Sequence, residues 1–331
     1  MDKILVTGGV GFIGSHITDE LIKLGAEVVI LDDLSGGFRE NINPKAKFVE
    51  GSINDQSLID KIFKEEKFDY IFHLAAYAAE GLSQFIKHFN YENNLIGTVN
   101  LINASVNNNV KCFVFTSSIA VYGAGQLPMT EEMKPEPEDS YGIAKYAVEL
   151  DLKASHELFG LNYIIFRPHN VFGEKQNIGD KYRNVVGIFM NQIMQNQPIT
   201  IFGDGEQKRA FSYIGDIAPV IAKSIYNPKS YNQIFNIGGD EIITVNQLAQ
   251  LVFTAMGQKT SINYLPARQE VKLAYSDHAK VREVLGYENK IKIADGLKIM
   301  AEWAKKVGAK KSQNFDKIEI TKNLPSSWLV K

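Results

Sequence analysis

The chain has 331 residues, of which 45% are hydrophobic, and its formal net charge at pH 7 is -2. This is the composition of an ordinary globular protein with room for about two domains, and its near-balanced charge without a basic run gives no electrostatic basis for binding nucleic acid or anionic lipid. No apolar stretch reaches the roughly 18 residues that span a bilayer, and the first residues lead into a glycine-rich turn rather than a signal peptide, so we expect a cytoplasmic protein that binds no membrane.

The first predicted element is a strand, a turn and a helix. The apolar run 4–6 is followed by Gly8, Gly11 and Gly14 at three-residue spacing and by a helix-like segment, 15–24. In a turn of this type the first glycine permits the tight turn, the second lets the backbone approach a pyrophosphate, and the third lets helix and strand pack closely; the phosphates lie at the positive end of the helix. The spacing GxxGxxG is a variant of the ordinary GxGxxG fingerprint, so by itself it is weak support for a dinucleotide site.

The second strand, 28–31, ends in Asp32, eighteen residues after Gly14. A carboxylate at that strand end accepts hydrogen bonds from both adenosine ribose hydroxyls and repels a 2′-phosphate, which selects NAD over NADP. Asp32 and Asp33 could instead form a solvated turn, where aspartate is common. Because the glycines precede them, we favour the ribose interpretation and predict NAD as the cofactor.

The next segments alternate between strand and helix patterns. In chain order they are a strand at 47–50, a helix at 57–65, a strand at 70–74, a helix at 95–106, and strands at 113–116 and 163–167. This alternation predicts an α/β fold with a doubly wound parallel sheet of the Rossmann type, whose ligands bind beyond the carboxyl ends of the strands. The only cysteine, Cys112, leads into an apolar strand, and we expect it to be a small core residue rather than a nucleophile.

The pattern changes near residue 170, where we place a soft domain boundary. A polar loop follows, then a helix-like segment, 185–195, and a strand-like run, 199–202, before helices dominate. We predict an NAD-binding domain at 1–170 with return segments from about 211–240. A smaller C-terminal α/β lobe at 171–331 would mainly bind substrate.

A tyrosine and a lysine open another predicted helix, whose cap we assign to Ser140. The i, i+4 spacing places Tyr141 and Lys145 on one helix face. A free tyrosine has a pKa near 10, so a base near neutrality needs a fall of about three units, or roughly 4 kcal/mol. An adjacent ammonium and a positive nicotinamide ring both favour the phenolate. An isolated YxxxK match is more often an amphipathic face, but this one follows an NAD half-site and a serine-rich strand end. We therefore predict that Tyr141 and Lys145 are catalytic and that Ser118 hydrogen-bonds the reacting oxygen or Tyr141, rather than only capping a turn.

Together with further motifs, these residues resemble the extended short-chain dehydrogenase/reductase family, in particular its nucleotide-sugar epimerases. The resemblance covers roughly residues 1–290. The motifs that carry it are Thr7–Gly14, Asp32–Ser35, His73–Ala76, Asn93–Asn94, Ser117–Gly123, Tyr141 with Lys145, Arg167–Gly173 and Phe202–Arg209.

The resemblance implies two sets of binding residues and no metal. The expected cofactor contacts are Gly8, Gly11, Phe12, Ile13, Gly14, Asp32, Asp33, Ser35, Ser52, Ile53, Leu74, Ala75, Ala76, Asn94, Ser117, Tyr141, Lys145, Pro168 and His169. The expected contacts of a nucleoside diphosphate sugar are Glu80, Ser118, Tyr141, Asn170, Val185, Arg209 and Arg268. Glu80 could equally be a solvated loop acid, and the two arginines could be surface charges, although a bidentate fork suits a diphosphate. No spaced ligand set accompanies His73 or His169, which we interpret as packing and hydrogen-bonding residues.

The resemblance also implies a mechanism and an assembly. Tyr141 would remove the proton of the sugar 4-hydroxyl while the C4 hydride passes to NAD; the bound 4-keto sugar would turn over, and the hydride would return to its opposite face. Lys145 would bind the nicotinamide ribose and lower the pKa of Tyr141. Relatives pair through two helices, which here begin near Leu95 and Tyr141, so we expect a homodimer.

Related reactions need groups that this chain lacks. Sugar dehydratases carry an Asp-Glu pair just after the strand-end serines, and uronic acid decarboxylases carry a Glu there, whereas this chain has Ile119 and Ala120. Apolar groups cannot shuttle protons, which disfavours both reactions. Epimerisation at C3 and C5 uses a cysteine after the serines, but Cys112 precedes them. Chemistry at C4 alone remains.

We therefore expect an NAD-dependent 4-epimerase of a UDP-hexose, that is UDP-glucose/UDP-galactose or an N-acetyl or uronate relative. The alternatives are a nucleotide-sugar 4-dehydrogenase or 4-ketoreductase, for example on a GDP-sugar, and a non-catalytic NAD-binding sensor or scaffold. Four positions depart from the family pattern: Ser52, Ala78, Ala210 and Val271 stand where Asp, Lys, Asp and Asp are usual.

Overall fold

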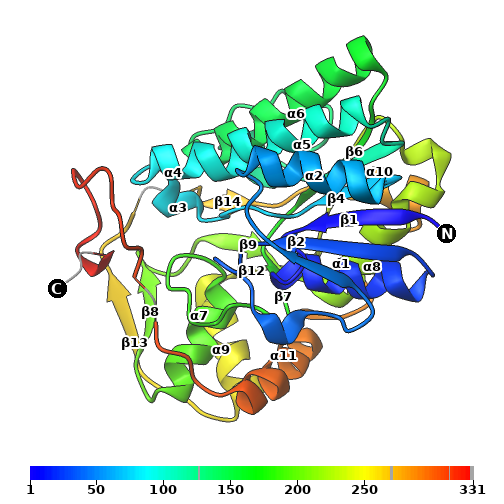
Figure 1. Ribbon diagram of the computed structural model, residues 1–331. Coiled ribbons are helices and arrows are strands. Elements are labelled where there is room, and N and C mark those ends of the chain that lie inside the picture. The colour runs from blue at the N-terminus through cyan, green and yellow to red at the C-terminus, as the bar shows by residue number, and fades with distance from the viewer. Residues whose placement is uncertain (126, 269–270, 313, 329–331) are drawn as a thin grey trace.

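The central element is a sheet of seven parallel strands, in the order β11-β6-β5-β4-β1-β2-β3 (Figure 1). The computed structural model describes residues 1–125, 127–268, 271–312 and 314–328. The strands are β1 (Lys3–Thr7), β2 (Glu27–Asp32), β3 (Lys47–Glu50), β4 (Tyr70–His73), β5 (Cys112–Thr116), β6 (Asn162–Pro168) and β11 (Gln233–Ile237). The chain order reverses between β1 and β4, so the predicted doubly wound parallel sheet is confirmed.

Helices cover both faces of this sheet because successive strand residues point in opposite directions. In β2, Val28 and Ile30 lie in one buried cluster, and Val29 and Leu31 lie in another. One face packs on α1 (Phe12–Lys23), α8 (Ile214–Lys223) and α10 (Ala279–Leu285); the other packs on α2 (Gln56–Glu66), α5 (Gly97–Asn107) and α6 (Ser140–Phe159).

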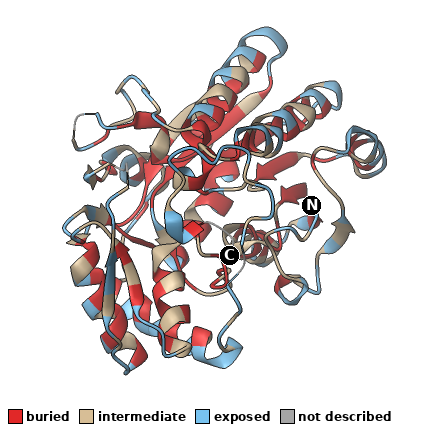
Figure 2. Ribbon diagram, turned by 90° about the vertical axis from the view of Figure 1, so that its left-hand side faces the viewer, coloured by how far each residue is buried: buried red, intermediate tan, exposed pale blue. Residues whose placement is uncertain are grey.

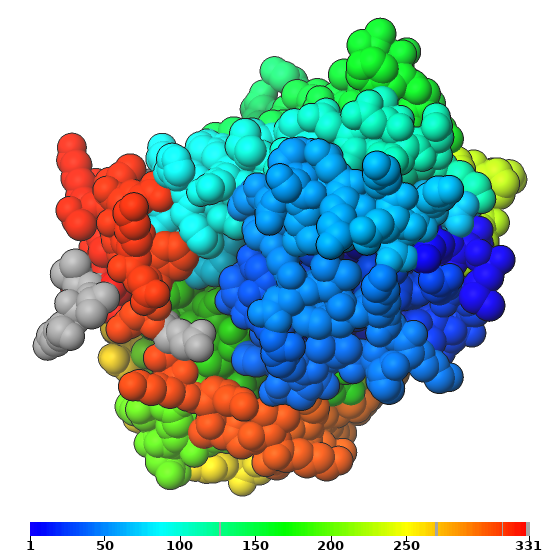
Figure 3. Space-filling model, in the orientation of Figure 1, coloured from blue at the N-terminus to red at the C-terminus, as the bar shows by residue number. Residues whose placement is uncertain are grey.

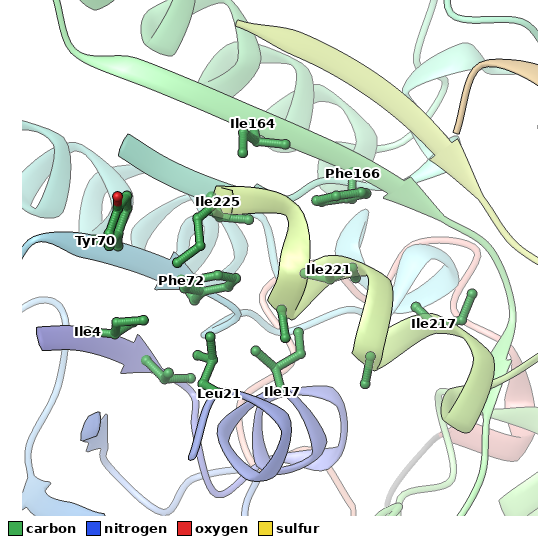
Figure 4. Close-up of a cluster of buried hydrophobic side chains, with 14 of the residues drawn as sticks. Ile4, Ile17, Leu21, Tyr70, Phe72, Ile164, Phe166, Ile217, Ile221 and Ile225 are labelled. Carbon is green, nitrogen blue, oxygen red and sulfur yellow. The ribbon is translucent and has the colours of Figure 1, made fainter. Parts of the chain in front are cut away.

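Figure 4 shows the first face in close-up: Ile17 and Leu21 of α1 and Ile217 and Ile221 of α8 point toward the strands. Buried residues are concentrated on the strands and the inner helix faces (Figure 2). Cys112 is fully buried in β5, as predicted.

Two helix starts differ from the sequence prediction, and two short helices were not predicted. Helix α1 begins at Phe12, three residues before the expected start, since the glycine loop ends in the extended Gly11. The segment expected as one helix from 95 begins instead with a π-helical turn, Glu92–Ile96, that leads into α5. Two short helices, α3 (Glu80–Ser83) and α4 (Lys87–Tyr91), precede this turn.

The second lobe has a hydrophobic core of its own. Its helices are α7 (Val185–Met194), α9 (Val245–Met256) and α11 (Ile293–Val307). Its strands form small sheets: β7 (Val171–Phe172) with β10 (Ser212–Tyr213), β8 (Ile199–Phe202) with β13 (Ile262–Leu265), and β9 (Lys208–Ala210) with β12 (Ile242–Thr244) and β14 (Leu273–Ala274).

The chain returns from this lobe to the sheet twice. The first return, α8 and β11, lies within the expected 211–240 segment: α8 packs on α1, and β11 pairs with β6. The second return was not expected: α10 and the following residues place Val281 and Tyr287 in the core around α1 and α8. We therefore propose that 279–287 belongs with the first domain. The helix is only seven residues long, too short to give a clear periodic pattern.

The C-terminal segment runs back across the boundary between the two lobes. The Glu319 carboxylate accepts hydrogen bonds from the backbone N–H groups of His88 and Phe89, and Trp328 is buried in a cluster with Leu82 and Tyr182. In the space-filling view this segment, in red, lies against the cyan region that contains α4 (Figure 3). None of the helices in the described ranges combines the length and hydropathy that crossing a membrane requires.

Candidate active site

A cavity of about 1080 Å³ lies at the carboxyl edge of the sheet and extends between the two lobes. Its wall includes the glycine loop, the ends of β2, β4, β5 and β6, and the first turns of α6. The second lobe contributes residues from β8, β9 and the segment before α7. The volume is at the upper end of the range of about 300–1,000 Å³ common for small-molecule sites, and the position is the one expected for ligands of a doubly wound sheet.

Most of the expected binding residues lie on this wall. Those of the cofactor set are Gly8, Gly11, Phe12, Ile13, Gly14, Asp32, Asp33, Ser35, Ile53, Leu74, Ala75, Ala76, Ser117, Tyr141, Lys145, Pro168 and His169. Those of the substrate set are Glu80, Ser118, Tyr141, Asn170, Val185, Arg209 and Arg268. Their individual contacts with ligands remain predictions.

The glycine loop has the shape that a dinucleotide pyrophosphate needs. Gly8 has a φ of +68°, and a Cβ there would come within 2.6 Å of the backbone N of Ala75. A Cβ on Gly14 would come within 2.1 Å of the Gly8 carbonyl oxygen, so the helix can approach the loop this closely only because residue 14 is a glycine. Gly11 is the N-cap of α1 and offers no side chain to its first N–H groups. The residues present therefore fit a bound pyrophosphate at the positive end of α1.

Asp32 lies at the end of β2 with its carboxylate on the cavity wall. It accepts hydrogen bonds from the backbone N–H of Val10 at 3.2 Å and of Leu34 at 2.8 Å, one on each oxygen. Burial raises the pKa of this carboxyl, and the backbone hydrogen bonds partly oppose the rise. A carboxylate held in this way favours a hydrogen-bond donor in the cavity, which a ribose hydroxyl supplies.

The expected catalytic residues converge at the carboxyl end of β5. Tyr141 and Lys145 lie on the first turns of α6, and the Lys145 Nζ donates to the Thr116 carbonyl at 2.8 Å. This nitrogen lies 5.8 Å from the centre of the Tyr141 ring. The Ser118 hydroxyl hydrogen-bonds the Tyr141 phenol, which lowers the pKa of Tyr141. The three side chains thus face one part of the cavity.

The cap of α6 differs from the prediction. The structure assigns it to Asp139, whose carboxylate accepts from the Gly142 backbone N–H at 2.8 Å, and Ser140 is the first helical residue. Aspartate and serine are similarly good caps, so the sequence pattern alone could not separate two adjacent candidates.

The electrostatics of Tyr141 and Lys145 also differ from the expectation. Burial is the largest effect on both: it raises the pKa of Tyr141, and it lowers the pKa of Lys145 to about 7. Glu80 and Asp139 raise the pKa of Tyr141 further, while Arg183 lowers it. The protein's own groups therefore do not produce the predicted fall in the Tyr141 pKa. Burial disfavours the charged form of both groups, the phenolate and the ammonium, and the sequence pattern does not reveal how deeply they are buried.

A buried ion pair behind the expected catalytic residues was not predicted. The Glu149 carboxylate accepts from the Ser117 Oγ at 2.5 Å and from the Arg167 Nε at 2.9 Å, and the Arg167 Nη1 donates to the Tyr122 hydroxyl at 2.7 Å. The Glu149 charge raises the pKa of Lys145 against the effect of burial. Glu149 stands four residues after Lys145, so the two side chains share one helix face, and this spacing in the sequence could have indicated that Glu149 lies close to Lys145.

Two expected cofactor residues, Ser52 and Asn94, do not line the cavity. The Ser52 Oγ accepts from the Asn54 backbone N–H, and the buried Asn94 side chain pairs with the backbone N–H and carbonyl of Tyr77. Asn94 lies in the π-helical turn and fixes the segment after β4. The cofactor contacts expected of these two residues therefore stay predictions, and Asn94 holds Tyr77, which is a residue of the wall.

The two histidines are buried and hydrogen-bonded. His73 lies between the hydroxyls of Thr7 and Thr98, at 2.7 and 2.8 Å from its ring nitrogens. His169 lies on the wall, where burial and the neighbouring His278 lower its pKa to about 3. Among the described residues, no group of three or more His, Cys, Asp or Glu is arranged to hold a metal ion.

Residues on the substrate side belong mainly to the second lobe. The Arg268 guanidinium lies 4.5 Å from the centre of the Phe202 ring and 6.0 Å from that of Trp328, and Arg209 donates to the Val271 carbonyl. Sequence reasoning missed Trp328 because the tail carries no recognisable motif. Asn170, with a φ of +41°, donates to the Ala210 carbonyl at 2.9 Å.

Comparisons with known proteins agree with this geometry. The profile of the NAD dependent epimerase/dehydratase family matches residues 4–238. The chain belongs to the NAD-dependent epimerase/dehydratase family. The predicted family and enzyme class are therefore confirmed, and the family description names the predicted cofactor.

Among proteins of this family, a putative UDP-glucose 4-epimerase of Methanocaldococcus jannaschii is 38% identical over 91% of this chain and 98% of its own length. The solved structure of UDP-glucose 4-epimerase from Thermotoga maritima, with UDP-glucose, has a TM-score of 0.88 at 36% identity and covers 92% of this chain and 99% of that one. UDP-N-acetylglucosamine 4-epimerase from Methanobrevibacter ruminantium, in complex with UDP-N-acetylmuramic acid, has a TM-score of 0.84 at 33% identity, covering 91% and 97%.

Proposed function

We propose that this protein is an NAD-dependent 4-epimerase of a UDP-hexose and that it inverts C4 through a transient 4-keto sugar. The observation that carries the proposal is the convergence of Ser118, Tyr141 and Lys145 on the same cavity as the glycine loop and Asp32. This arrangement brings a proton acceptor for a sugar hydroxyl to the site where a nicotinamide ring would lie. The relatives are similar over nearly the whole chain, which supports the same conclusion.

Each catalytic residue has a role that follows from its surroundings. NAD, which the glycine loop and Asp32 would hold, would supply a reversible hydride acceptor for C4. Tyr141 takes the proton of the 4-hydroxyl on its phenol oxygen and gives it back, while Ser118 donates a hydrogen bond to that oxygen and stabilises the phenolate. Lys145, held by the Thr116 carbonyl, is positioned to donate a further hydrogen bond to a ribose hydroxyl.

The wall next to Ser118 supports chemistry at C4 alone. Ile119 and Ala120 line the cavity directly after this serine, and neither side chain carries a proton donor or acceptor. Elimination of water or loss of a carboxylate requires an additional acid or base there. Epimerisation requires only that the ketone be able to turn over between the two hydride transfers.

The identity of the hexose and the assembly are the finer parts of the proposal. The relatives include enzymes named for UDP-glucose and for UDP-N-acetylglucosamine, so we propose UDP-glucose/UDP-galactose or an N-acetyl or uronate relative as the substrate. We also propose a homodimer through α5 and α6. Large apolar side chains are exposed on and next to these helices, namely Ile96, Ile143, Leu150, Leu158 and Phe159.

The test is conversion of candidate UDP-hexoses followed by NMR of the anomeric proton. The full-length protein should interconvert at least one 4-epimer pair without added NAD, and Tyr141→Phe should abolish the conversion. Tyr146→Phe is a matched control, since Tyr146 lies on α6 but not on the cavity wall. Stoichiometric formation of NADH would instead indicate the dehydrogenase alternative. Bound NAD without conversion of any UDP- or GDP-hexose would indicate the sensor alternative and reject the proposal.

A further inference from the structure

Arg183 is a largely buried cation on the cavity wall that sequence reasoning did not assign. It comes from the second lobe, two residues before α7, and its side chain is 14% exposed. The Nε donates to the Asp180 carboxylate at 2.6 Å, and the guanidinium carbon lies 4.6 Å from the centre of the Tyr77 ring. These two contacts hold the planar group in one orientation, which is the condition for recognising a phosphate by two parallel hydrogen bonds.

The Nη2 atom of Arg183 lies over the loop that follows the ribose-binding strand. It is 3.2 Å from the position that a Cβ on Gly36 would occupy. The next residue, Gly37, packs so closely on the glycine loop that a Cβ there would come within 2.6 Å of the Val10 carbonyl carbon and 2.8 Å of the Gly11 nitrogen. Arg183 therefore reaches from the second lobe toward the loop whose backbone N–H groups open helix α1.

The other arginines on the wall face a different part of the cavity. Arg209 donates to the Val271 carbonyl, and Arg268 lies over Phe202 and 3.5 Å from the Cβ position of Gly81 on α3. A dinucleotide and a sugar nucleotide bring two diphosphates into one site, and each needs its own cationic partners. Of these three arginines, Arg183 is the one that approaches the Gly36 loop.

We propose that Arg183 binds the pyrophosphate of the dinucleotide from the side opposite the glycine loop, so that the two lobes hold the cofactor between them. This inference rests on the proposed binding of NAD. An epimerase does not consume its cofactor, and a clamp formed by both lobes retains the dinucleotide while sugar nucleotides exchange. The charge of Arg183 also reaches Tyr141 and lowers its pKa, so the same guanidinium favours the ionised base.

The test measures binding by calorimetry to the full-length protein freed of bound nucleotide. The ligands are NADH, ADP-ribose, which has the pyrophosphate but no nicotinamide, and adenosine, which has neither. Arg183→Met should weaken the binding of NADH and ADP-ribose by about 10–100-fold, the loss expected when a hydrogen bond to a charged group is removed, and leave adenosine unchanged. Arg39→Met is the matched control, since Arg39 is an exposed arginine that pairs with Glu50 and does not line the cavity.

Other outcomes overturn the inference. These are a loss of ADP-ribose affinity below about tenfold, an equal loss of adenosine affinity, or an equal loss of ADP-ribose affinity in Arg39→Met. If the wild type binds neither NADH nor ADP-ribose, the proposed function fails; if the wild type binds both and Arg183→Met binds equally well, only this inference fails.

A second variant guards against misfolding. Arg183→Met leaves the Asp180 carboxylate, whose side chain is 8% exposed, without its cation, and an unpaired buried charge can unfold a protein. Asp180→Asn with Arg183→Met removes both charges and should show the same ligand pattern. If this double variant binds ADP-ribose like the wild type, the inference is wrong even where the single variant does not fold.

Discussion

Replacing Glu149 by glutamine should destabilise the protein by about 3–5 kcal/mol, the cost of breaking a buried ion pair by removing one partner. The side chains of Glu149 and Arg167 are 3% and 2% exposed, so solvent cannot compensate the guanidinium that is left. The carboxylate accepts hydrogen bonds from the Ser117 Oγ and from both Nε and Nη2 of Arg167. Ser117 Oγ and Arg167 Nε share one carboxylate oxygen and Nη2 bonds the other, so an amide turns its N–H₂ group toward at least one of these donors in either orientation.

The assay is urea denaturation, with the free energy of unfolding as the measured quantity. Glu157→Gln, an exposed change on the same helix, should stay within about 0.5 kcal/mol of the wild type. In the double variant Glu149→Gln with Arg167→Met neither charge remains, so its loss should be clearly smaller than the sum of the two single losses. The reasoning is refuted if Glu149→Gln is as stable as Glu157→Gln, or if the two single losses simply add.

Three further predictions concern stability, the cofactor and assembly. Burial lowers the pKa of Lys145 from 10.5 to about 7, so below pH 7 the folded protein carries a buried ammonium that destabilises it. Between pH 7 and 10.5 the folded state has lost this proton while the unfolded state keeps it. The destabilisation by Lys145 therefore becomes smaller as the pH rises through this range. Lys145→Met should therefore gain more stability over the wild type at pH 6 than at pH 9, and equal gains by urea denaturation would contradict this. Gly14→Ala forces a Cβ to 2.1 Å from the Gly8 carbonyl and should weaken NAD binding by about tenfold or more, whereas unchanged NADH affinity by fluorescence titration would show that the loop can relax. Leu150→Glu on α6 should convert the proposed dimer into a monomer by light scattering, and Ile299→Glu on α11 should not; a wild-type monomer would rule the dimer out.

The sequence was sufficient for the parts of the fold that depend on local patterns. Short apolar runs and helical periodicity predicted a doubly wound parallel sheet, and Gly8, Asp32 and the Tyr141-Lys145 spacing identified residues that meet on one cavity. These signals work because each arises within a single strand, turn or helix face.

Contacts between distant segments were not predictable in this way. Arg167 meets Glu149 from another element, and Arg183 reaches the Gly36 loop from the second lobe, so neither contact has a characteristic spacing. Helix α10 was missed because seven residues carry too little periodicity. The pKa argument for Tyr141 considered neighbouring charges but not burial, which only the packed structure reveals.

The C-terminal segment forms a part of the cavity wall that can change in sequence independently of the central sheet. Ile320 through Trp328 contribute to the wall without belonging to either of the cores around the sheet, and the segment is fastened chiefly at Glu319 and Trp328. Mutations between these two points can reshape this part of the cavity while Tyr141, Lys145 and the sheet stay in place. Closely similar sheets can in this way carry cavities of different shape.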